Sequence, residues 1–450
     1  MPDAGPAHHP DTIVVGGGIA GLAAALRLQD LGFEPLVLES EPRVGGRMTT
    51  DRVDGFAIDR GVTLIGNRFR RMRSLAKRLG LGPIMQPVGF RLGLQDEHGC
   101  RSYRARRPDD IIFDRRISLS AKFALLRFYL GMLRHQRALV HGHSDRSEAI
   151  DAESTWQYLS RLGAGGQELF SQIFEPGLRA AVGGSLAPAS RAILMQTVWN
   201  TLAGGFWNLT DGVDRIPEAI ASEVPVLTNA HVEQIEFDVH GPRITAGVNG
   251  QTRCFSVRGC ILAVPGHRVP MLCPQLPSWI KEPLARTGFS KIASAHVALS
   301  RPPESPYAGY GFAGRKMDGV GVLELEHLRA PGRCPEGKGM VSVYFTDTEA
   351  FHCLDRSDAD LQARAVDVVE QTFPEVANQT LFVHVIRWPT GIAVFPAGRL
   401  TEMTKIRRRL SQWDTPIDIC GDYLDGLSSE GALRTGEQAA ERLASRLGKL

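Results

Sequence analysis

Residues 11–39 constrain the fold of this 450-residue chain more than any other stretch. They read DTIVVGGGIAGLAAALRLQDLGFEPLVLE. The β-branched run 13–15 is typical of a buried strand, and three glycines follow it at once. The apolar segment 22–28 predicts a helix that ends at Gly32, and residues 36–38 predict a second strand. This order of strand, glycine turn, helix and strand predicts an α/β fold with a parallel sheet.

The glycine turn has the spacing of a dinucleotide-binding motif. Gly16 permits a tight turn out of the strand, Gly18 allows a pyrophosphate to approach the backbone, and Gly21 allows helix and strand to pack closely. The start of the helix offers free N–H groups to the phosphates. Glu39 lies 21 residues beyond Gly18, where its carboxylate can accept hydrogen bonds from a ribose. Because the glycines, helix and acid occur together, they predict dinucleotide binding.

Two further motifs follow the second expected strand. Residues 43–50 read RVGGRMTT, which places two glycines beside Arg47 and offers a cation to a phosphate or ribose. Residues 55–61 read GFAIDRG and predict a hairpin that returns to the nucleotide. Together with the first glycine motif, this pattern resembles the flavin amine oxidase superfamily. That superfamily includes monoamine and polyamine oxidases, protoporphyrinogen oxidases and phytoene desaturase-like enzymes, and the resemblance implies FAD rather than NAD.

Two distant segments extend the resemblance. Residues 417–422 read IDICGD and residues 428–433 read SSEGAL, similar to the C-terminal segment that closes over the flavin in this superfamily. The resemblance implies that an acid of this segment meets the ribityl chain and that the helix start faces the flavin C2 carbonyl, where its dipole stabilises negative charge. Residues 212–236 resemble the element whose valine backbone meets the adenine, here Val232. Asp211-Gly212 stands where the superfamily usually has Gly-Gly.

Nineteen positions are therefore expected to bind the cofactor. They are Gly16, Gly18, Ile19, Ala20, Gly21, Glu39, Ser40, Gly46, Arg47, Gly61, Thr63, Leu64, Val232, Gly421, Asp422, Ser429, Glu430, Gly431 and Ala432.

The separated motifs imply a discontinuous architecture. We expect a Rossmann-type FAD-binding domain, of the kind called GR2, from residues 1–90, 205–270 and 385–450. Residues 91–204 and 271–384 are expected to form an interleaved α+β substrate-binding domain.

The residues expected to face the substrate follow from one further similarity. Residues 387–398, RWPTGIAVFPAG, resemble the segment that lines the substrate face of the flavin. The expected substrate-facing residues are Trp388, Thr390, Gly391, Ile392 and Ser428. Gly391 and Ser428 stand where monoamine oxidases carry the tyrosines of an aromatic cage, so the cage is expected to be absent.

Three more positions bear on catalysis. Thr390 replaces the cysteine that links the flavin covalently in those enzymes, which implies non-covalent FAD. Their flavin-side lysine corresponds to Ser294, with Lys291 close by. His296 is interpreted as a structural histidine, and no catalytic residue or metal site is assigned.

The expected activity is transfer of a hydride from a C–H bond of a bulky small-molecule substrate to FAD, followed by reoxidation by O2 or another acceptor. It would be a dehydrogenation or desaturation of the protoporphyrinogen oxidase type. Three alternatives stay open: a redox-neutral isomerisation or cyclisation, amine oxidation, and a non-catalytic FAD-binding scaffold.

Charge and composition limit the partners and the location. The net charge is only +3, and we expect no nucleic-acid partner. Residues 51–150 hold 20 basic and 10 acidic side chains, with basic clusters at 68–78 and 101–107 and an apolar segment at 120–133. Residues 68–137 therefore predict either a solvated basic face or contact with an anionic partner or a membrane surface. No secretory signal or membrane span is evident, so the expected location is cytoplasmic, with peripheral membrane contact as the alternative. The oligomeric state is left open.

Overall fold

A parallel sheet of five strands carries the N-terminal glycine motif. The computed structural model describes residues 10–88, 91–104, 109–139, 146–202, 205–313, 317, 319–345, 350 and 352–448. The strand order is β10 (Val226–Leu227), β2 (Pro35–Leu38), β1 (Thr12–Val15), β14 (Gly259–Leu262) and β20 (Ile417–Ile419). All four neighbouring pairs are parallel. Segments from the start, middle and end of the chain thus meet in one sheet, as the separated motifs predict.

Side chains of this sheet alternate between two faces, as the pleat requires. Val14, Val37 and Ile261 pack with helices α1 (Ile19–Asp30), α10 (Arg215–Glu223) and α17 (Ser429–Arg446). Ile13 and Leu262 pack on the other side with an antiparallel sheet. That sheet contains β11 (Ala230–Asp238), β12 (Gly241–Val248) and β13 (Gln251–Ser256).

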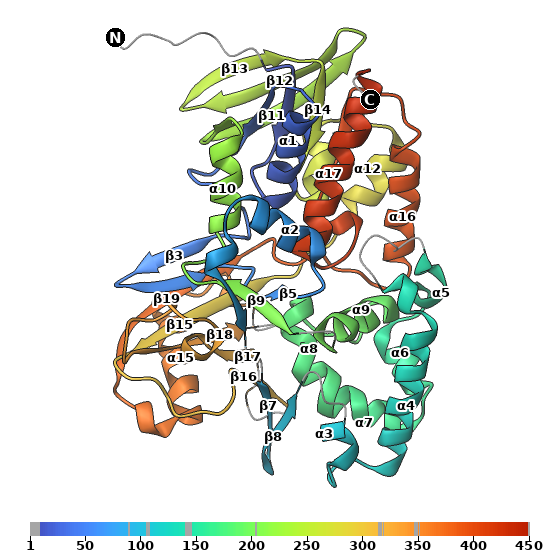
Figure 1. Ribbon diagram of the computed structural model, residues 1–450. Coiled ribbons are helices and arrows are strands. Elements are labelled where there is room, and N and C mark those ends of the chain that lie inside the picture. The colour runs from blue at the N-terminus through green and yellow to red at the C-terminus, as the bar shows by residue number, and fades with distance from the viewer. Residues whose placement is uncertain are drawn as a thin grey trace.

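Helices α1 and α17 lie side by side over the sheet (Figure 1). A side chain at Gly436 would place its Cβ only 2.1 Å from the carbonyl oxygen of Ala20. The glycine therefore permits the close approach of the two helices. This packing brings the C-terminal segment beside the first glycine motif.

A seven-stranded sheet forms a second body of the molecule, at the lower left of Figure 1. Its order is β19 (Thr380–Trp388), β15 (Ile292–Leu299), β18 (Gly339–Phe345), β17 (Val320–Leu325), β16 (Gly309–Phe312), β7 (Arg91–Asp96) and β8 (Gly99–Arg104). Only the pair of β16 and β7 is parallel among these described strands. Helix α15 (Asp358–Thr372) packs on β15 and β19, and the short α13 (Glu326–Arg329) lies beside β18.

A layer of helices lies at the lower right of Figure 1. Its members are α3 (Asp109–Phe113), α4 (Leu119–Arg134), α5 (Glu148–Asp151), α6 (Thr155–Ser160), α7 (Ala164–Leu169), the π-helical turn Phe170–Phe174, α8 (Glu175–Val182) and α9 (Arg191–Leu202).

Smaller elements join these parts. They are the hairpin β3 (Thr50–Val53) and β4 (Phe56–Asp59), the sheet β5 (Ile65–Gly66), β9 (Phe206–Leu209) and β6 (Met85–Val88), and helices α2 (Arg70–Arg78), α11 (Val269–Leu272), α12 (Ser278–Ala285) and α16 (Arg399–Leu410). Short 3-10 turns occupy Gly82–Ile84, Gln136–Ala138, Gly266–Arg268, Pro374–Val376 and Asp422–Leu424.

The architecture confirms the predicted fold class of a Rossmann-type α/β part with an interleaved α+β part. All five parallel strands fall within 12–38, 226–262 and 417–419, and all seven strands of the second sheet fall within 91–104 and 292–388. Helix α12 packs against α16, beside the parallel sheet rather than the seven-stranded one. Residues 278–285 of α12 are thus placed beside the parallel sheet.

Candidate functional site

The turn between β1 and α1 has the geometry that a pyrophosphate requires. A Cβ at Gly21 would lie 1.9 Å from the Gly16 carbonyl oxygen, so only glycine permits this packing of helix on strand. A Cβ at Gly18 would have no heavy atom within 4 Å, so there is room for a ligand beside this residue. The residue before α1 is Gly18, which has no side chain to cap the helix, so the first N–H groups of α1 receive no side-chain cap from it.

Glu39 closes the other side of the turn. Its Oε2 accepts the Gly17 N–H at 2.5 Å, and its Oε1 accepts the Glu41 N–H at 2.9 Å and the Ser40 hydroxyl at 3.2 Å. Its main-chain carbonyl accepts the Ala230 N–H at 2.8 Å. The ends of β2 and β11 thus lie together, and Val232 is buried two residues further along β11.

Arg47 joins three distant segments at this site. Its Nη1 donates to the Gly391 carbonyl at 2.6 Å and to Asp422 Oδ2 at 2.8 Å. Burial alone would lower the pKa of Arg47, but the ion pair with Asp422 raises it above its ordinary value. A Cβ at Gly46 would lie 3.4 Å from the Gly18 Cα, so the second glycine motif faces the first. The predicted proximity of Gly18, Gly46, Arg47 and Asp422 is therefore present.

Residues 61–64 lie next to Arg47. A Cβ at Gly61 would approach the Arg47 carbonyl oxygen to 2.4 Å, so this position also requires glycine. The Thr63 carbonyl accepts from Asn208 Nδ2 at 2.8 Å and from Arg329 Nη2 at 2.7 Å, and Leu64 is half-buried beside it. These contacts hold the 61–64 segment against β9 and α13.

The C-terminal segment meets the same site through the start of α17. Ser428 caps this helix, because its Oγ accepts the Gly431 N–H at 3.0 Å. Ser429, Glu430, Gly431 and Ala432 form its first turn. Gly421 is tied to this helix through Thr435 Oγ1, which accepts the Gly421 N–H at 3.1 Å.

The resemblance implies that an acid of the C-terminal segment meets the ribityl chain of the flavin. Glu430 is one acid of this segment, but its carboxylate is used inside the protein. Its two carboxylate oxygens accept the N–H groups of Arg71 and Met72, each at 2.9 Å, and so cap α2. Asp422, beside Arg47, is therefore the acid of this segment that remains to face a ligand.

The expected substrate-facing residues lie together, but several of their side chains are used for packing. Trp388 Nε1 donates to the Arg60 carbonyl at 2.7 Å. Thr390 and Ile392 are half-buried on either side of Gly391. Ser428 is the helix cap described above.

The surroundings of Gly391 are set by the pairing of two chain segments. Gly391 is buried, and its N–H donates to the Ser290 carbonyl at 2.9 Å. A Cβ there would meet this carbonyl oxygen at 2.9 Å and Ile292 Cδ1 at 2.9 Å. A tyrosine at this position would disrupt the pairing of the two segments rather than narrow a pocket.

A cavity of about 290 Å³ lies next to this pairing. It is lined by residues 182–185, 188, 189, 193, 290, 291, 393–395 and 427. Leu427 directly precedes the cap of α17, so the cavity adjoins the helix start. Lys291 is its charged lining residue, and its Nζ donates to the Pro389 carbonyl at 2.6 Å.

Comparison with known proteins identifies the family. The profile of the family described as "Flavin containing amine oxidoreductase" matches residues 19–444, almost the whole chain. The chain belongs to this family.

Individual relatives of this flavin-containing oxidoreductase carry different names. A Mycobacterium tuberculosis protein, provisionally named the flavin-containing monoamine oxidase AofH, is 27% identical over 97% of each chain. The coproporphyrinogen III oxidase of Bacillus subtilis is 22% identical over 95% of this chain and 96% of its own. The structure of cyclohexylamine oxidase from Brevibacterium oxydans aligns with a TM-score of 0.75 at 18% identity, covering 98% and 99% of the two chains.

The cofactor of this oxidoreductase is FAD, and the residues present fit it. The open space at Gly18 and the uncapped start of α1 suit the pyrophosphate, and the Glu39 carboxylate lies beside them through its bond to the Gly17 N–H. The start of α17 offers a second positive helix end, in the segment whose Asp422 pairs with Arg47.

His296, Ser294 and Ser342 form a buried hydrogen-bonded network, of which the sequence indicated only the structural role of His296. His296 Nδ1 lies 2.7 Å from Ser342 Oγ and its Nε2 lies 3.0 Å from Ser294 Oγ. Burial lowers the pKa of His296 to about 3, so the ring is neutral. Both His296 and Ser294 are thus structural residues of the seven-stranded sheet. This agrees with the interpretation of His296 as a structural histidine.

A buried ion pair was missed altogether. Asp59 accepts from Arg333 Nη2 at 2.6 Å, and both side chains are almost fully buried. It links the β3–β4 hairpin to the loop before β18. The partners are 274 residues apart in the chain, so no local pattern could indicate their contact.

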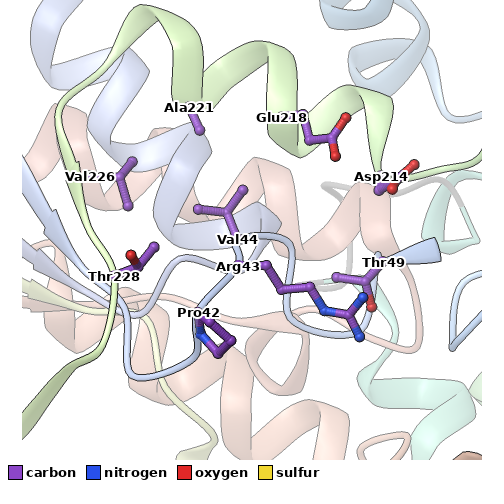
Figure 2. Close-up of a pocket in the computed structure, with 9 residues that line it drawn as sticks. All are labelled: Pro42, Arg43, Val44, Thr49, Asp214, Glu218, Ala221, Val226 and Thr228. Carbon is purple, nitrogen blue, oxygen red and sulfur yellow. The ribbon is translucent and has the colours of Figure 1, made fainter. Parts of the chain in front are cut away.

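A second hollow of about 270 Å³ lies between the 42–49 loop and α10 (Figure 2). Arg43 extends from the loop, and Asp214 and Glu218 project from the start of α10. Its lining includes neither Gly18 nor Glu39, and we assign it no ligand.

Proposed function

We propose that this enzyme uses FAD to take a hydride from a C–H bond of a bulky, uncharged or anionic organic substrate held in the cavity beside Leu427. The observation that carries the proposal is the chemistry of the cavity lining. It is mostly apolar, contains Lys291 and contains no carboxylate.

Charge in the lining disfavours a protonated amine. An ammonium group would meet the positive charge of Lys291 with no acidic lining residue to compensate. The Lys291 ammonium has three donors, and the Pro389 carbonyl uses one of them. The remaining donors could bind a carboxylate or carbonyl of the substrate. Phe395 is the one aromatic residue of the lining, which agrees with the expected lack of an aromatic cage.

The chain's own residues position the reactants. Gly18 and the α1 start would bind the pyrophosphate, Glu39 the ribose, and Arg47 with Asp422 would fix the segment between them. Bound FAD would supply the hydride acceptor and pass the electrons to O2 or another acceptor. Thr390 carries no thiol, which supports non-covalent binding. The cavity residues would exclude water and orient the reacting C–H bond toward the α17 start.

The proposed division of labour follows the strands except at β19, which crosses residue 385. Residues 1–90, 205–270 and 385–450 would bind FAD, and the interleaved residues would bind the substrate, with residues 271–290 packed beside the FAD part.

Amine oxidation is the second candidate, because the AofH and cyclohexylamine oxidase names each belong to proteins that match nearly the whole chain. The two candidates differ in the charge of the substrate. They can therefore be separated with one substrate panel.

The test is anaerobic addition of candidate substrates to the purified yellow holoprotein while the absorbance of oxidised flavin is followed. The panel contains carboxylate-bearing substrates such as coproporphyrinogen III, and benzylamine, cyclohexylamine and putrescine as amines. Bleaching by a neutral or anionic compound and not by the amines supports the proposal. Rapid bleaching by an amine assigns amine oxidation instead. A product of unchanged mass formed without bleaching or oxygen uptake indicates a redox-neutral reaction, and a protein inert to every compound supports the scaffold alternative.

A further inference from the structure

The basic region expected across residues 68–137 is not one surface in the structure. On α2, Arg71 pairs with Glu437, Arg78 pairs with Asp30 at 2.6 Å, and Arg68 stacks over Trp199 at 4.2 Å. Arg101 is buried and pairs with Asp96 at 2.8 Å. Residues 105–108, which include Arg106 and Arg107, lie outside the described residues. The arginines named here are used in contacts within the protein, whereas α4 carries basic residues beside exposed apolar ones.

Helix α4 is apolar on two opposite faces. Its buried face consists of Ala121, Ala124, Leu125, Phe128 and Met132. Its exposed apolar residues are Leu119 (74% exposed), Phe123 (68%), Leu126 (53%), Leu130 (57%) and Leu133 (51%). Since successive helical residues are about 100° apart, the exposed set forms a stripe about 80° wide, centred opposite the buried face. A surface helix ordinarily keeps polar residues on that side.

The preceding helix α3 also carries exposed apolar side chains. Phe113, at the end of α3, is 80% exposed, and Ile112 beside it is 47% exposed. Contiguous apolar side chains of this kind mark interaction surfaces on soluble proteins. We call the side chains of Ile112, Phe113, Leu119, Phe123, Leu126, Leu130 and Leu133 the α4 stripe.

Basic side chains border the α4 stripe on both edges. By the same helical angle, Lys122 lies on one edge and Arg127 and Arg134 lie on the other, and α4 contains no acidic residue. Arg115 and Arg116 are exposed between Phe113 and Leu119. An apolar stripe with basic edges is the pattern of a helix that lies in the interface of a membrane.

We propose that the α4 stripe docks this protein onto a lipid bilayer that contains anionic headgroups. The apolar side chains would enter the boundary between headgroups and acyl chains, and the basic edges would contact lipid phosphates. No helix among the described residues is both long and apolar enough to cross a bilayer, so the contact is peripheral.

The charge of the edges argues against a second copy of this chain as the occupant. Leu119, Phe123, Leu126, Leu130 and Leu133 follow the 4-3-4-3 spacing of a coiled-coil seam. In such a pair, Lys122, Arg127 and Arg134 would occupy the flanking positions of both helices. Like charges would then face one another, whereas an anionic membrane provides the opposite charge.

The membrane-facing helix lies one layer away from the substrate cavity. The inner side of α4 approaches α9, because a Cβ at Gly131 would lie 3.5 Å from Met195 Cε. Ile193, on the same helix as Met195, lines the cavity. Docking would thus bring the substrate part of the enzyme to the bilayer. The inference does not depend on the proposed substrate class.

The test is flotation of the FAD-loaded full-length protein with vesicles of phosphatidylcholine alone or mixed with phosphatidylglycerol. The wild-type protein should bind the mixed vesicles more tightly, and high salt should weaken that binding. The triple variant Phe123→Ser, Leu126→Ser and Leu130→Ser should weaken binding about 100-fold or more, because each side chain loses its apolar burial. A matched control replaces exposed apolar residues elsewhere, Val239→Ser and Met271→Ser, and should bind as the wild type does.

Reversing the charge of the basic residues on both edges of the α4 stripe provides a second, independent test. Lys122→Glu, Arg127→Glu and Arg134→Glu together should weaken binding to mixed vesicles about 100-fold or more, since each basic residue contributes about 1 kcal/mol near an anionic surface. Arg243→Glu with Arg253→Glu, exposed on β12 and β13, is the matched control.

Three results would overturn the proposal. They are wild-type protein that floats with neither vesicle, a serine variant that binds as tightly as the wild type, and a vesicle-free oligomer that the serine variant dissociates. The last result would assign the α4 stripe to a second copy of the chain. FAD content and flavin reduction in solution should be unchanged in both triple variants.

Discussion

Replacing Arg47 by methionine should weaken FAD binding more than any other single change in the 40–50 loop. The Arg47 guanidinium makes two hydrogen bonds that close the site, to the Gly391 carbonyl at 2.6 Å and to Asp422 at 2.8 Å. Each hydrogen bond of a charged group contributes about 1.5–3 kcal/mol. Because 35% of the Arg47 side chain is exposed, we use the lower value for both, which gives about 3 kcal/mol. Because 1.4 kcal/mol corresponds to a tenfold change, the FAD dissociation constant should rise about 100-fold.

The control is a substitution of Arg43, four residues before Arg47 in the chain. Arg43 donates to Asp51 at 2.7 Å, but its side chain is 45% exposed, and Asp51 keeps Arg60 and His384 as partners. Arg43→Met should therefore change the dissociation constant by less than about fivefold, as expected for a surface ion pair. The assay is titration of apoprotein with FAD, followed by flavin fluorescence. An Arg47→Met dissociation constant within threefold of wild type, or an equal loss in Arg43→Met, would refute the reasoning.

Three further changes test other parts of the structure. Glu39→Ala should weaken FAD binding by about 1.5–3 kcal/mol, while Glu41→Ala should not; equal affinities for both variants in the same titration would exclude Glu39 from the ribose site. The pKa of His296, lowered to about 3 by burial, lies below its unfolded value near 6.5, so the unfolded chain binds the extra proton more readily. Stability should therefore fall by about 1.4 kcal/mol per pH unit as the pH decreases between these values, and His296→Asn should show a smaller fall in urea unfolding at pH 7 and pH 5. Gly391→Ala should destabilise the protein by about 1–3 kcal/mol because its Cβ would overlap a carbonyl oxygen, whereas Gly288→Ala, with its nearest atom at 3.8 Å, should be neutral; equal melting temperatures would contradict this packing.

The sequence predicted the nucleotide side of the molecule well, because those requirements are local. Gly16, Gly18 and Gly21 each have a steric reason that can be read from spacing alone, and the structure gives each glycine the expected surroundings. The spacing of Glu39 placed it correctly at the end of β2. The resemblance brought the C-terminal segment to the same site, where Asp422 meets Arg47.

The substrate side was harder to predict, because its contacts join distant segments. Gly391 reads as an open position, yet its surroundings are fixed by pairing with Ser290, about 100 residues earlier. Glu430 sits in a cofactor motif, yet its carboxylate caps α2. The sequence indicated the apolar segment 120–133 and its basic surroundings, but composition alone did not show which of its apolar side chains are buried and which are exposed.

The most direct test of the account is the rate of anaerobic flavin reduction when the mouth of the cavity is filled. Val394 lines the cavity and is 36% exposed, so Val394→Trp should block substrate entry without disturbing the core. Val239, 95% exposed on a distant turn, provides the control Val239→Trp. With the substrate that the screen identifies, Val394→Trp should bind a full complement of FAD but reduce it at least tenfold more slowly than wild type, whereas Val239→Trp should match the wild type. Reduction of the Val394→Trp flavin at the wild-type rate would show that the substrate reacts elsewhere.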